Sequence, residues 1–214
     1  MHLEPEHIYH IYNQGNNRQK IFFNSENYLF FLKKIRTHIL PYADILAWCL
    51  MPNHFHLMVY VLPTGIATSS GNISSVTTGS ATSSGTPSKH TLNDSIGKML
   101  SSYTRAINKQ ENYSGSLFRE KTKAECVTKQ TEITPSFLNS QFGTVINVHS
   151  ADKDYPNACF DYIHKNPVKA KLVENQEDWI YSSYSDYFCG RKGSLINKDR
   201  AKEFITLELY FDKQ

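Results

Sequence analysis

The chain lacks an apolar stretch long enough to cross a membrane, and its first residues lack the basic and apolar segments of a secretory signal peptide. Cysteine is scarce, and no two cysteines have the Cys-x-x-Cys spacing of a zinc cluster. The four thiols are Cys49, Cys126, Cys159 and Cys189. Such scattered cysteines are typical of reduced core residues rather than of a disulfide framework. We therefore expect a cytoplasmic protein with no membrane partner.

A strong charge imbalance is also missing. The chain has 23 Lys and Arg residues against 20 Asp and Glu residues, a net charge of +3 that does not by itself identify a nucleic-acid partner. Hydrophobic residues make up 40% of the 214 residues and aromatic residues 13%, enough for a folded core. We expect one domain that spans residues 1–214.

Charged residues are absent from residues 64–88, which are rich in Ser, Thr and Gly. The string Ala-Thr-Ser-Ser-Gly occurs at residues 67–71 and again at 81–85. A short repeat of this kind indicates expansion of a low-complexity tract rather than a structural repeat. The segment is predicted to be a flexible insertion.

Hydrophobic periodicity outside that segment predicts the order β-α-β-β-α-β with a further helix. The expected strands cover residues 8–12, 45–50, 55–62 and 123–128. The expected helices run from an N-cap at Ser25 to Pro41, over residues 92–107 behind a Thr91–Asp94 capping box, and over residues 157–166. This order predicts an α+β fold, a ferredoxin-like antiparallel sheet with helices packed on it.

Two histidines flank one phenylalanine in the third expected strand. His54 and His56 point to the same face of that strand, with Cα atoms roughly 6.5–7 Å apart. The opposite face carries the apolar side chains. This spacing suits two imidazoles that bind one metal ion, but taken alone it favours two half-exposed polar residues that face solvent, so a second element must decide.

A second motif lies in the last expected helix, where Tyr162 and Asn166 share one face at positions i and i+4. Together, residues 52–56 (Pro-Asn-His-Phe-His) and 162–168 (Tyr-Ile-His-Lys-Asn-Pro-Val) resemble the signature of the single-tyrosine HUH transposases, and most closely that of the REP-associated tyrosine transposases. The resemblance extends over residues 7–62 and 92–187. Further matching stretches, in the same order, are residues 9–18, 114–119 and 179–184.

The resemblance implies an HUH endonuclease fold and an enzyme that nicks and rejoins DNA. Tyr162 would be the catalytic nucleophile, and its attack would leave a phosphotyrosine. His54, His56 and Asn166 would bind Mg²⁺ or Mn²⁺, although an imidazole pair also suits zinc. Asn53 is expected to be a turn residue rather than a ligand, and His164 should point away from Tyr162. The substrate would be single-stranded or hairpin DNA.

The same comparison indicates a second insertion at residues 131–150, because relatives have a shorter connection before the tyrosine helix. Within it, residues 144–149 alternate apolar and polar side chains, which is compatible with an extra hairpin. Relatives differ in whether they act as dimers, so the sequence is compatible with a homodimer as well as with a monomer.

Basic residues gather at residues 98–123 and 165–171, and aromatic residues interleaved with the first stretch could stack on bases. An ordinary solvated helix face would have the same composition. The candidate DNA-binding residues are Arg18, Arg105, Lys109, Arg119, Lys121, Lys123 and Lys165.

Other functions are compatible with parts of this pattern. A non-catalytic nucleic-acid-binding regulator could keep the fold, and an RNA-binding domain of similar topology would display aromatic residues on its sheet. A phosphodiesterase that hydrolyses small nucleotides would need no dedicated tyrosine. Tyr103 and Tyr113 are rival nucleophiles, although neither lies in a matching motif.

Overall fold

The computed structural model describes residues 1–63, 91–128 and 151–207, with side chains of the last range from residue 155 onward. The insertions expected at residues 64–88 and 131–150, including the hairpin at 144–149, lie outside this part of the chain. The principal elements are β1 (Ile8–Gln14), α1 (Ser25–His38), β2 (Ala43–Met51), β3 (His54–Val61), α2 (Leu92–Glu111), β4 (Lys123–Cys126) and α3 (Ala151–Lys169). Short helices follow at η1 (Asn16–Arg18), η2 (Gln176–Asp178), α4 (Tyr184–Phe188) and α5 (Lys198–Lys202).

The four strands form one sheet in the order β2-β3-β1-β4. Each neighbouring pair is antiparallel, and β3 and β1 are the two central strands. Together with the order of the helices, this arrangement confirms the predicted α+β, ferredoxin-like fold. In the register, His56 lies opposite Tyr12 on β1, and Tyr12 lies opposite Lys123 on β4.

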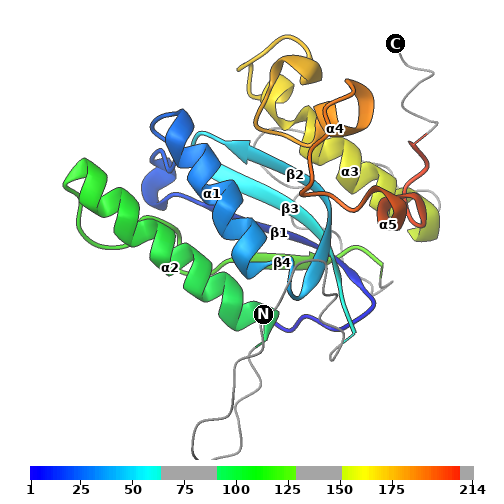
Figure 1. Cartoon of the computed structure of the whole chain (residues 1–214), viewed down its shortest axis with the longest axis horizontal. Helices are drawn as coiled ribbons and strands as arrows, with labels where there is room; N and C mark the ends of the chain where they lie inside the picture. Colours follow the sequence, from blue (N-terminus) through cyan, green and yellow to red (C-terminus); the bar gives the residue numbers. More distant parts are fainter. Residues whose placement is uncertain (64–90, 129–150, 208–214) are drawn as a thin grey trace, which may run out of the picture.

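Helices cover both faces of the sheet (Figure 1). On one face, side chains such as Phe31 of α1 and Tyr103 of α2 pack against Leu57. On the other face, α3 contributes a second cluster in which Phe160 packs with Met58. Side chains that alternate along β3 therefore enter two different buried clusters. The face that carries the histidines is buried because α3 lies over it.

Two details of the helices differ from the sequence prediction. The N-cap of α1 is Asn24 rather than Ser25, because Asn24 has an extended backbone and its side chain accepts a hydrogen bond from the Asn27 N–H. In α3, a proline at position 167 would be expected to end the helix near Asn166. The helix instead continues to Lys169, so Asn166 stays on the same helical face as Tyr162.

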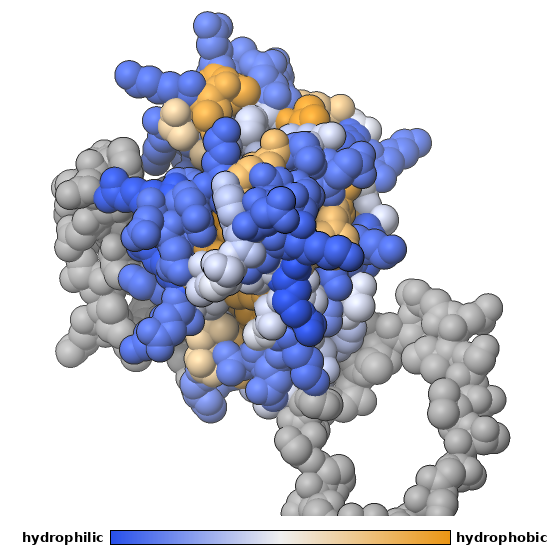
Figure 2. Space-filling model, turned by 90° about the vertical axis from the view of Figure 1, so that its left-hand side faces the viewer, coloured by the Kyte–Doolittle hydropathy of each residue, from blue (hydrophilic) through white to orange (hydrophobic). Residues whose placement is uncertain are grey.

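Helix α2 begins at the predicted capping box, where Thr91 and Asp94 exchange side-chain and backbone hydrogen bonds. Its apolar residues face α1 and the sheet, and its charged residues face outward. Figure 2, which views the molecule from the α2 side, shows a mostly hydrophilic surface with small, separated apolar patches. Within the described parts of the chain, no helix is long and apolar enough to span a membrane.

Helix α3 is held on the sheet by a hydrogen-bond chain through Ser183. The His164 Nε2 atom lies 2.7 Å from the Ser183 hydroxyl, which also accepts a 2.9 Å hydrogen bond from the Trp48 N–H of β2. The Ser183 N–H donates to the Trp48 carbonyl (2.9 Å), so the chain after α3 pairs with the free edge of β2. All three side chains are buried.

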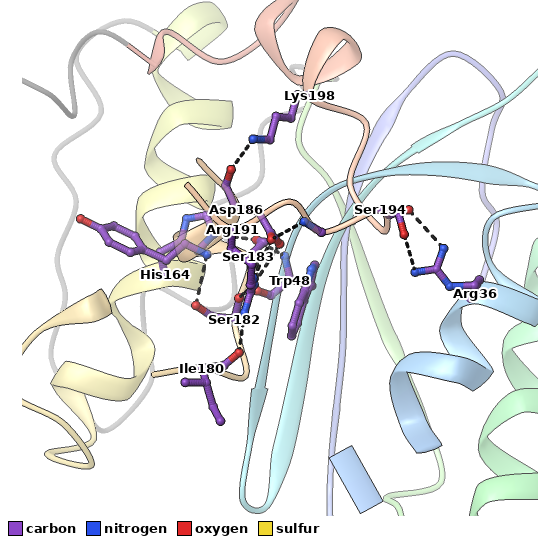
Figure 3. Close-up of polar contacts among 12 residues, drawn as sticks. Arg36, Trp48, His164, Ile180, Ser182, Ser183, Asp186, Arg191, Ser194 and Lys198 are labelled. Carbon is purple, nitrogen blue, oxygen red and sulfur yellow. Dashed lines mark hydrogen bonds and ion pairs between the residues drawn. The ribbon is translucent and has the colours of Figure 1, made fainter. Parts of the chain in front are cut away.

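A buried ion pair holds the segment that carries Ser183 (Figure 3). The Asp186 carboxylate is 2% exposed and accepts hydrogen bonds from both Arg191 Nε (2.6 Å) and the Gly193 N–H (3.2 Å). Arg191 also donates to the carbonyls of Ile180 and Ser182. Because one guanidinium joins three parts of this segment, the loop after α3 has a defined shape against β2.

Replacing Ser183 with alanine should destabilise the fold, because the Trp48 N–H and the His164 ring would each lose a buried partner. We expect Ser183→Ala to lower the free energy of unfolding by about 2–3 kcal/mol. Urea denaturation measures the change. Ser101→Ala is the control, since Ser101 is exposed on α2, and it should change the free energy by less than about 0.5 kcal/mol. Equal effects of the two substitutions would contradict the role given to Ser183.

Candidate active site

A tight hairpin sets the position of the two histidines. Pro52 and Asn53 alone connect β2 to β3, so His54 is the first residue of the strand. The loop after β1 closes against this turn, where the Gly15 N–H donates a 2.8 Å hydrogen bond to the Asn53 carbonyl. A Cβ atom at position 15 would lie 2.2 Å from the Gln19 carbonyl oxygen, so the close approach of Gln19 to this position requires glycine. The hairpin tip is thus braced by a neighbouring loop.

The Asn53 side chain orients the first histidine. Its Oδ1 atom lies 2.6 Å from His54 Nδ1, and its Nδ2 atom donates to the Arg18 carbonyl (3.2 Å). The second bond fixes which end of the amide faces the ring, because only Nδ2 can donate. His54 therefore carries its proton on Nδ1, and its Nε2 has a lone pair. This geometry agrees with the expectation that Asn53 is a turn residue and not a ligand.

Helix α3 brings the second sequence motif to the histidines. The ring of Tyr162 lies edge-on to the ring of His56, with centroids 5.4 Å apart. The Nδ2 atom of Asn166 lies 3.3 Å from His56 Nε2, and the same amide hydrogen-bonds with His54 and with the Tyr162 phenol. The rings of His54 and His56 are 5.0 Å apart. The four residues singled out in the two motifs thus lie side by side.

Burial keeps both imidazoles neutral. It lowers the pKa of His54 to about 4, against a smaller opposing effect of the Asn166 hydrogen bond. It lowers the pKa of His56 well below its usual value, and the neighbouring His54 and His10 rings add to the shift. Burial also raises the pKa of the Tyr162 phenol, which the hydrogen bond with Asn166 opposes. The site therefore presents neutral rings and a protonated phenol at neutral pH.

Two neutral imidazoles and an amide suit a divalent cation. The Nδ1 atoms of His54 and His56 are each held by another side chain, so their Nε2 atoms are the ones turned toward Asn166. Partners of this kind are typical of histidines that bind metals. Asn166 would bind a cation through Oδ1, and the two ends of its amide have nearly the same shape. In the described ranges, no three His, Cys, Asp or Glu side chains form a metal-binding group. The candidate set here differs because its third member, Asn166, is an amide.

Two site residues were not predicted from the sequence. His10 is completely buried on β1, with its Nε2 atom 2.9 Å from His56 Nδ1. Lys169 lies two turns beyond Tyr162 on α3, with its ammonium group 5.3 Å above the centre of the phenol ring. The available signal for His10 was its position in β1, where it alternates with Tyr9 and Ile11 and so shares a face with Tyr12. Lys169 stands at i+7 from Tyr162, on the same side of a helix.

Most of the predicted DNA-binding residues lie around one end of the sheet. Arg18 follows the Gly15 loop, Arg119 donates its N–H to the carbonyl of the last residue of β1, and Lys123 begins β4 with its ammonium 6.0 Å above the Tyr12 ring. Lys121 is exposed just before Lys123, and Lys165 pairs with Asp161 on α3 at 2.7 Å.

Two predicted DNA-binding residues lie elsewhere. Arg105 and Lys109 are exposed on α2, which covers the opposite face of the sheet from α3 (Figure 1). The sheet separates them from Tyr162, so the structure does not bring these two basic residues to the histidine site.

The other residues weighed in the sequence lie away from the site. His164 points from α3 to Ser183, as expected. Tyr103 is fully buried on the α2 side of the sheet, and its hydroxyl donates to the Ile21 carbonyl (2.7 Å). Tyr113 follows α2 and is 49% exposed. Neither of these rival tyrosines lies on the histidine face.

Comparison with known proteins gives a match among solved structures but none among family models or curated sequences. Among solved structures, the chain is similar to a REP-associated tyrosine transposase bound to a REP hairpin, with a TM-score of 0.53 and 16% identity over 93% of this chain and 87% of that one. The match supports the resemblance drawn from the two motifs, and at this identity it establishes the architecture. The chain therefore has the fold of a REP-associated tyrosine transposase, an α+β fold of the HUH type.

Proposed function

We propose that this protein is a tyrosine transposase of the HUH type, an enzyme that nicks single-stranded or hairpin DNA and rejoins it through a phosphotyrosine. The observation that carries the proposal is the contact between α3 and β3, where Tyr162 and Asn166 meet both histidines. A phenol beside two neutral imidazoles and an amide combines a nucleophile with a set of cation ligands. A structural tyrosine would not need this setting.

In the proposed reaction, the Tyr162 oxygen attacks the phosphorus of a DNA phosphodiester. The new bond joins that oxygen to phosphorus, and the bond between phosphorus and the 3′ oxygen breaks. The phenol loses its proton, and the departing 3′ oxygen gains one to become a hydroxyl. His54, His56 and Asn166 would hold Mg²⁺ or Mn²⁺, and this cation would neutralise phosphate oxygens. Attack by another 3′ hydroxyl reverses the step and joins strands.

Lys169 is proposed to favour the attacking form of the phenol. Burial raises the pKa of Tyr162, so loss of its proton needs compensation inside the site. The Lys169 ammonium above the ring stabilises the negative charge that develops on the phenol as it reacts. The Lys169 ammonium would also attract the incoming phosphate.

The basic residues around the end of the sheet are proposed to bind the DNA backbone. Arg18, Lys121 and Lys123 are exposed close to the strand ends that carry the histidines. The Tyr12 ring beneath Lys123 offers a partly exposed aromatic surface next to His56. A single strand that passes over these residues would reach Tyr162 with its phosphates neutralised.

The alternatives fit the described residues less well. An RNA-binding domain of this topology stacks bases on an open sheet face, whereas α3 covers the face that carries Tyr12 and His56. A non-catalytic DNA-binding regulator keeps the same fold and remains the second candidate. It differs from the enzyme in one measurable respect, which is the formation of a covalent adduct.

The first prediction from the proposed function concerns the covalent adduct. The protein incubated with labelled single-stranded and hairpin DNA from the flanks of its own gene and with Mg²⁺ or Mn²⁺ should form a covalent complex on a denaturing gel. Tyr162→Phe should abolish the complex, because the attacking oxygen is removed, and His56→Ala should reduce it at least a hundredfold. Tyr113→Phe is the control and should change nothing. DNA binding without any adduct would favour the regulator, and an adduct in Tyr162→Phe would mean that another residue attacks.

The second prediction concerns Lys169. Replacement with methionine keeps the length of the side chain and removes its charge, so Lys169→Met should slow adduct formation roughly tenfold. Lys169→Arg keeps a cation over the ring and should stay within about threefold of the wild type. Single-turnover gel assays with excess protein measure both rates. A rate that is unchanged in Lys169→Met would remove Lys169 from the mechanism.

The third prediction separates the two groups of basic residues. Lys123→Ala should lower the affinity for single-stranded DNA and reduce the slope of log K against log salt by about 0.7, the loss of one phosphate contact. Lys109→Ala, on the opposite side of the sheet, is the matched control and should leave the slope unchanged. Fluorescence anisotropy titrations at several salt concentrations give both slopes. The reverse result would place the DNA on the α2 face.

A further inference from the structure

His10 lies directly behind His56, on the side away from Asn166. The two rings lie side by side and nearly parallel, with centroids 5.0 Å apart, and His10 Nε2 is 2.9 Å from His56 Nδ1. The His10 ring also lies nearly parallel to the Tyr12 ring at 4.8 Å, and the rings of His10 and Tyr162 meet edge to face at 6.0 Å. His10 has no exposed surface, and its aromatic neighbours include His56, Tyr12 and Tyr162.

The short contact between the two imidazoles can form in two ways, because a neutral imidazole carries one N–H. If His10 donates from Nε2, then His56 has its proton on Nε2 and no lone pair toward Asn166. If His56 donates from Nδ1, its Nε2 lone pair faces Asn166. The Asn166 amide nitrogen, 3.3 Å from His56 Nε2, is a donor and fits only the second arrangement.

His54 is held in the corresponding tautomer by a different residue, Asn53. Asn53 accepts from His54 Nδ1 through Oδ1, while its Nδ2 donates to the Arg18 carbonyl. In this arrangement His54 and His56 both carry the proton on Nδ1, each with a different hydrogen-bond acceptor. In water, an isolated imidazole favours the opposite tautomer, with the proton on Nε2, so each ring needs a partner to hold the less common form.

We propose that His10 is a positioning residue that holds His56 in the Nδ1–H tautomer, so that its Nε2 lone pair faces the cation site. The inference rests on the proposed function, because it assigns His10 a task for the cation that His56 would bind. His10 touches neither the phosphate nor the cation and acts through His56.

A histidine suits this position better than a carboxylate. A carboxylate would accept the same hydrogen bond, but it would be a charge buried with no access to solvent, which costs several kcal/mol unless it is paired. It would also place a negative charge close to the site where a phosphodiester must bind. A neutral imidazole accepts the hydrogen bond without either cost, and its ring packs against both His56 and Tyr12.

The first test reads the tautomer of His56 directly, in the full-length protein without any cation. Long-range ¹H–¹⁵N NMR spectra of the histidine rings distinguish Nδ1–H from Nε2–H, and His56→Ala identifies the signal. We expect Nδ1–H in the wild type and Nε2–H in His10→Leu, which removes the acceptor. His10→Gln places an amide oxygen close to the position of Nε2 and should retain Nδ1–H. Tyr12→Phe, which keeps the ring stacked on His10, should also retain it.

The second test measures the affinity for Mn²⁺ alone, by electron paramagnetic resonance of free Mn²⁺. His10→Leu should weaken binding about 10–100-fold, the usual effect of removing a partner of a ligand. His10→Gln and Tyr12→Phe should stay within about threefold of the wild type. Thermal unfolding checks that each variant is folded, and if His10→Leu does not fold, the tautomer in the wild type and in His10→Gln decides.

An Nε2–H signal for His56 in the wild type would overturn the proposal, as would an unchanged tautomer in a folded His10→Leu. Unchanged Mn²⁺ affinity in that variant would also overturn it. These readouts do not depend on DNA. If they turn out as expected while no adduct forms with any DNA, the proposed function fails and the role of His10 stands.

Discussion

The hydrogen-bond chain from Trp48 through Ser183 to His164 determines where α3 lies on the sheet. His164 falls between Tyr162 and Asn166 in the sequence and points to the opposite side of the helix, so holding its ring fixes the direction of the other two side chains. A shift of one residue along an α-helix turns a side chain by about 100°. Such a shift would carry Tyr162 and Asn166 away from the histidines of β3. The geometry of the site therefore depends on a buried contact outside the site itself.

The same packing determines the charge of the site. With α3 over them, His54 and His56 are desolvated, and their pKa values fall far enough to keep them neutral. The carboxylate of Glu125 lies on β4, separated from His56 by strand β1, and it accepts a 2.7 Å hydrogen bond from the Tyr12 hydroxyl. The proposed ligand set contributes no negative charge, so a cation bound there would keep its full charge for a phosphodiester. Burial is therefore linked to the proposed function, since the desolvation that lowers these pKa values leaves each imidazole with a lone pair.

Much of this arrangement could be predicted from the sequence, because it follows from local periodicity. Alternation placed His54 and His56 on one face of a strand, and the spacing of four placed Tyr162 beside Asn166 on a helix. The role of His10 could not be predicted, because it depends on how β1 pairs with β3. Because α1 and β2 separate β1 from β3 in the chain, no hairpin turn sets the register of this pair. The N-cap was misplaced by one residue, since Asn24 and Ser25 are both good caps and only the backbone conformation distinguishes them.

The path of the chain after α3 argues for a site built within one subunit. Residues 181–183 return from the helix to pair with β2, where the Leu50 N–H donates to the Tyr181 carbonyl at 2.9 Å. An exchange of α3 between two subunits would have to carry this segment along or break its bonds with β2. It would also break the contact between His164 and Ser183 unless both moved together. Because Tyr162 already meets the histidines of its own chain, one subunit contains the whole set, and a dimer would gain no missing site residue by exchanging helices.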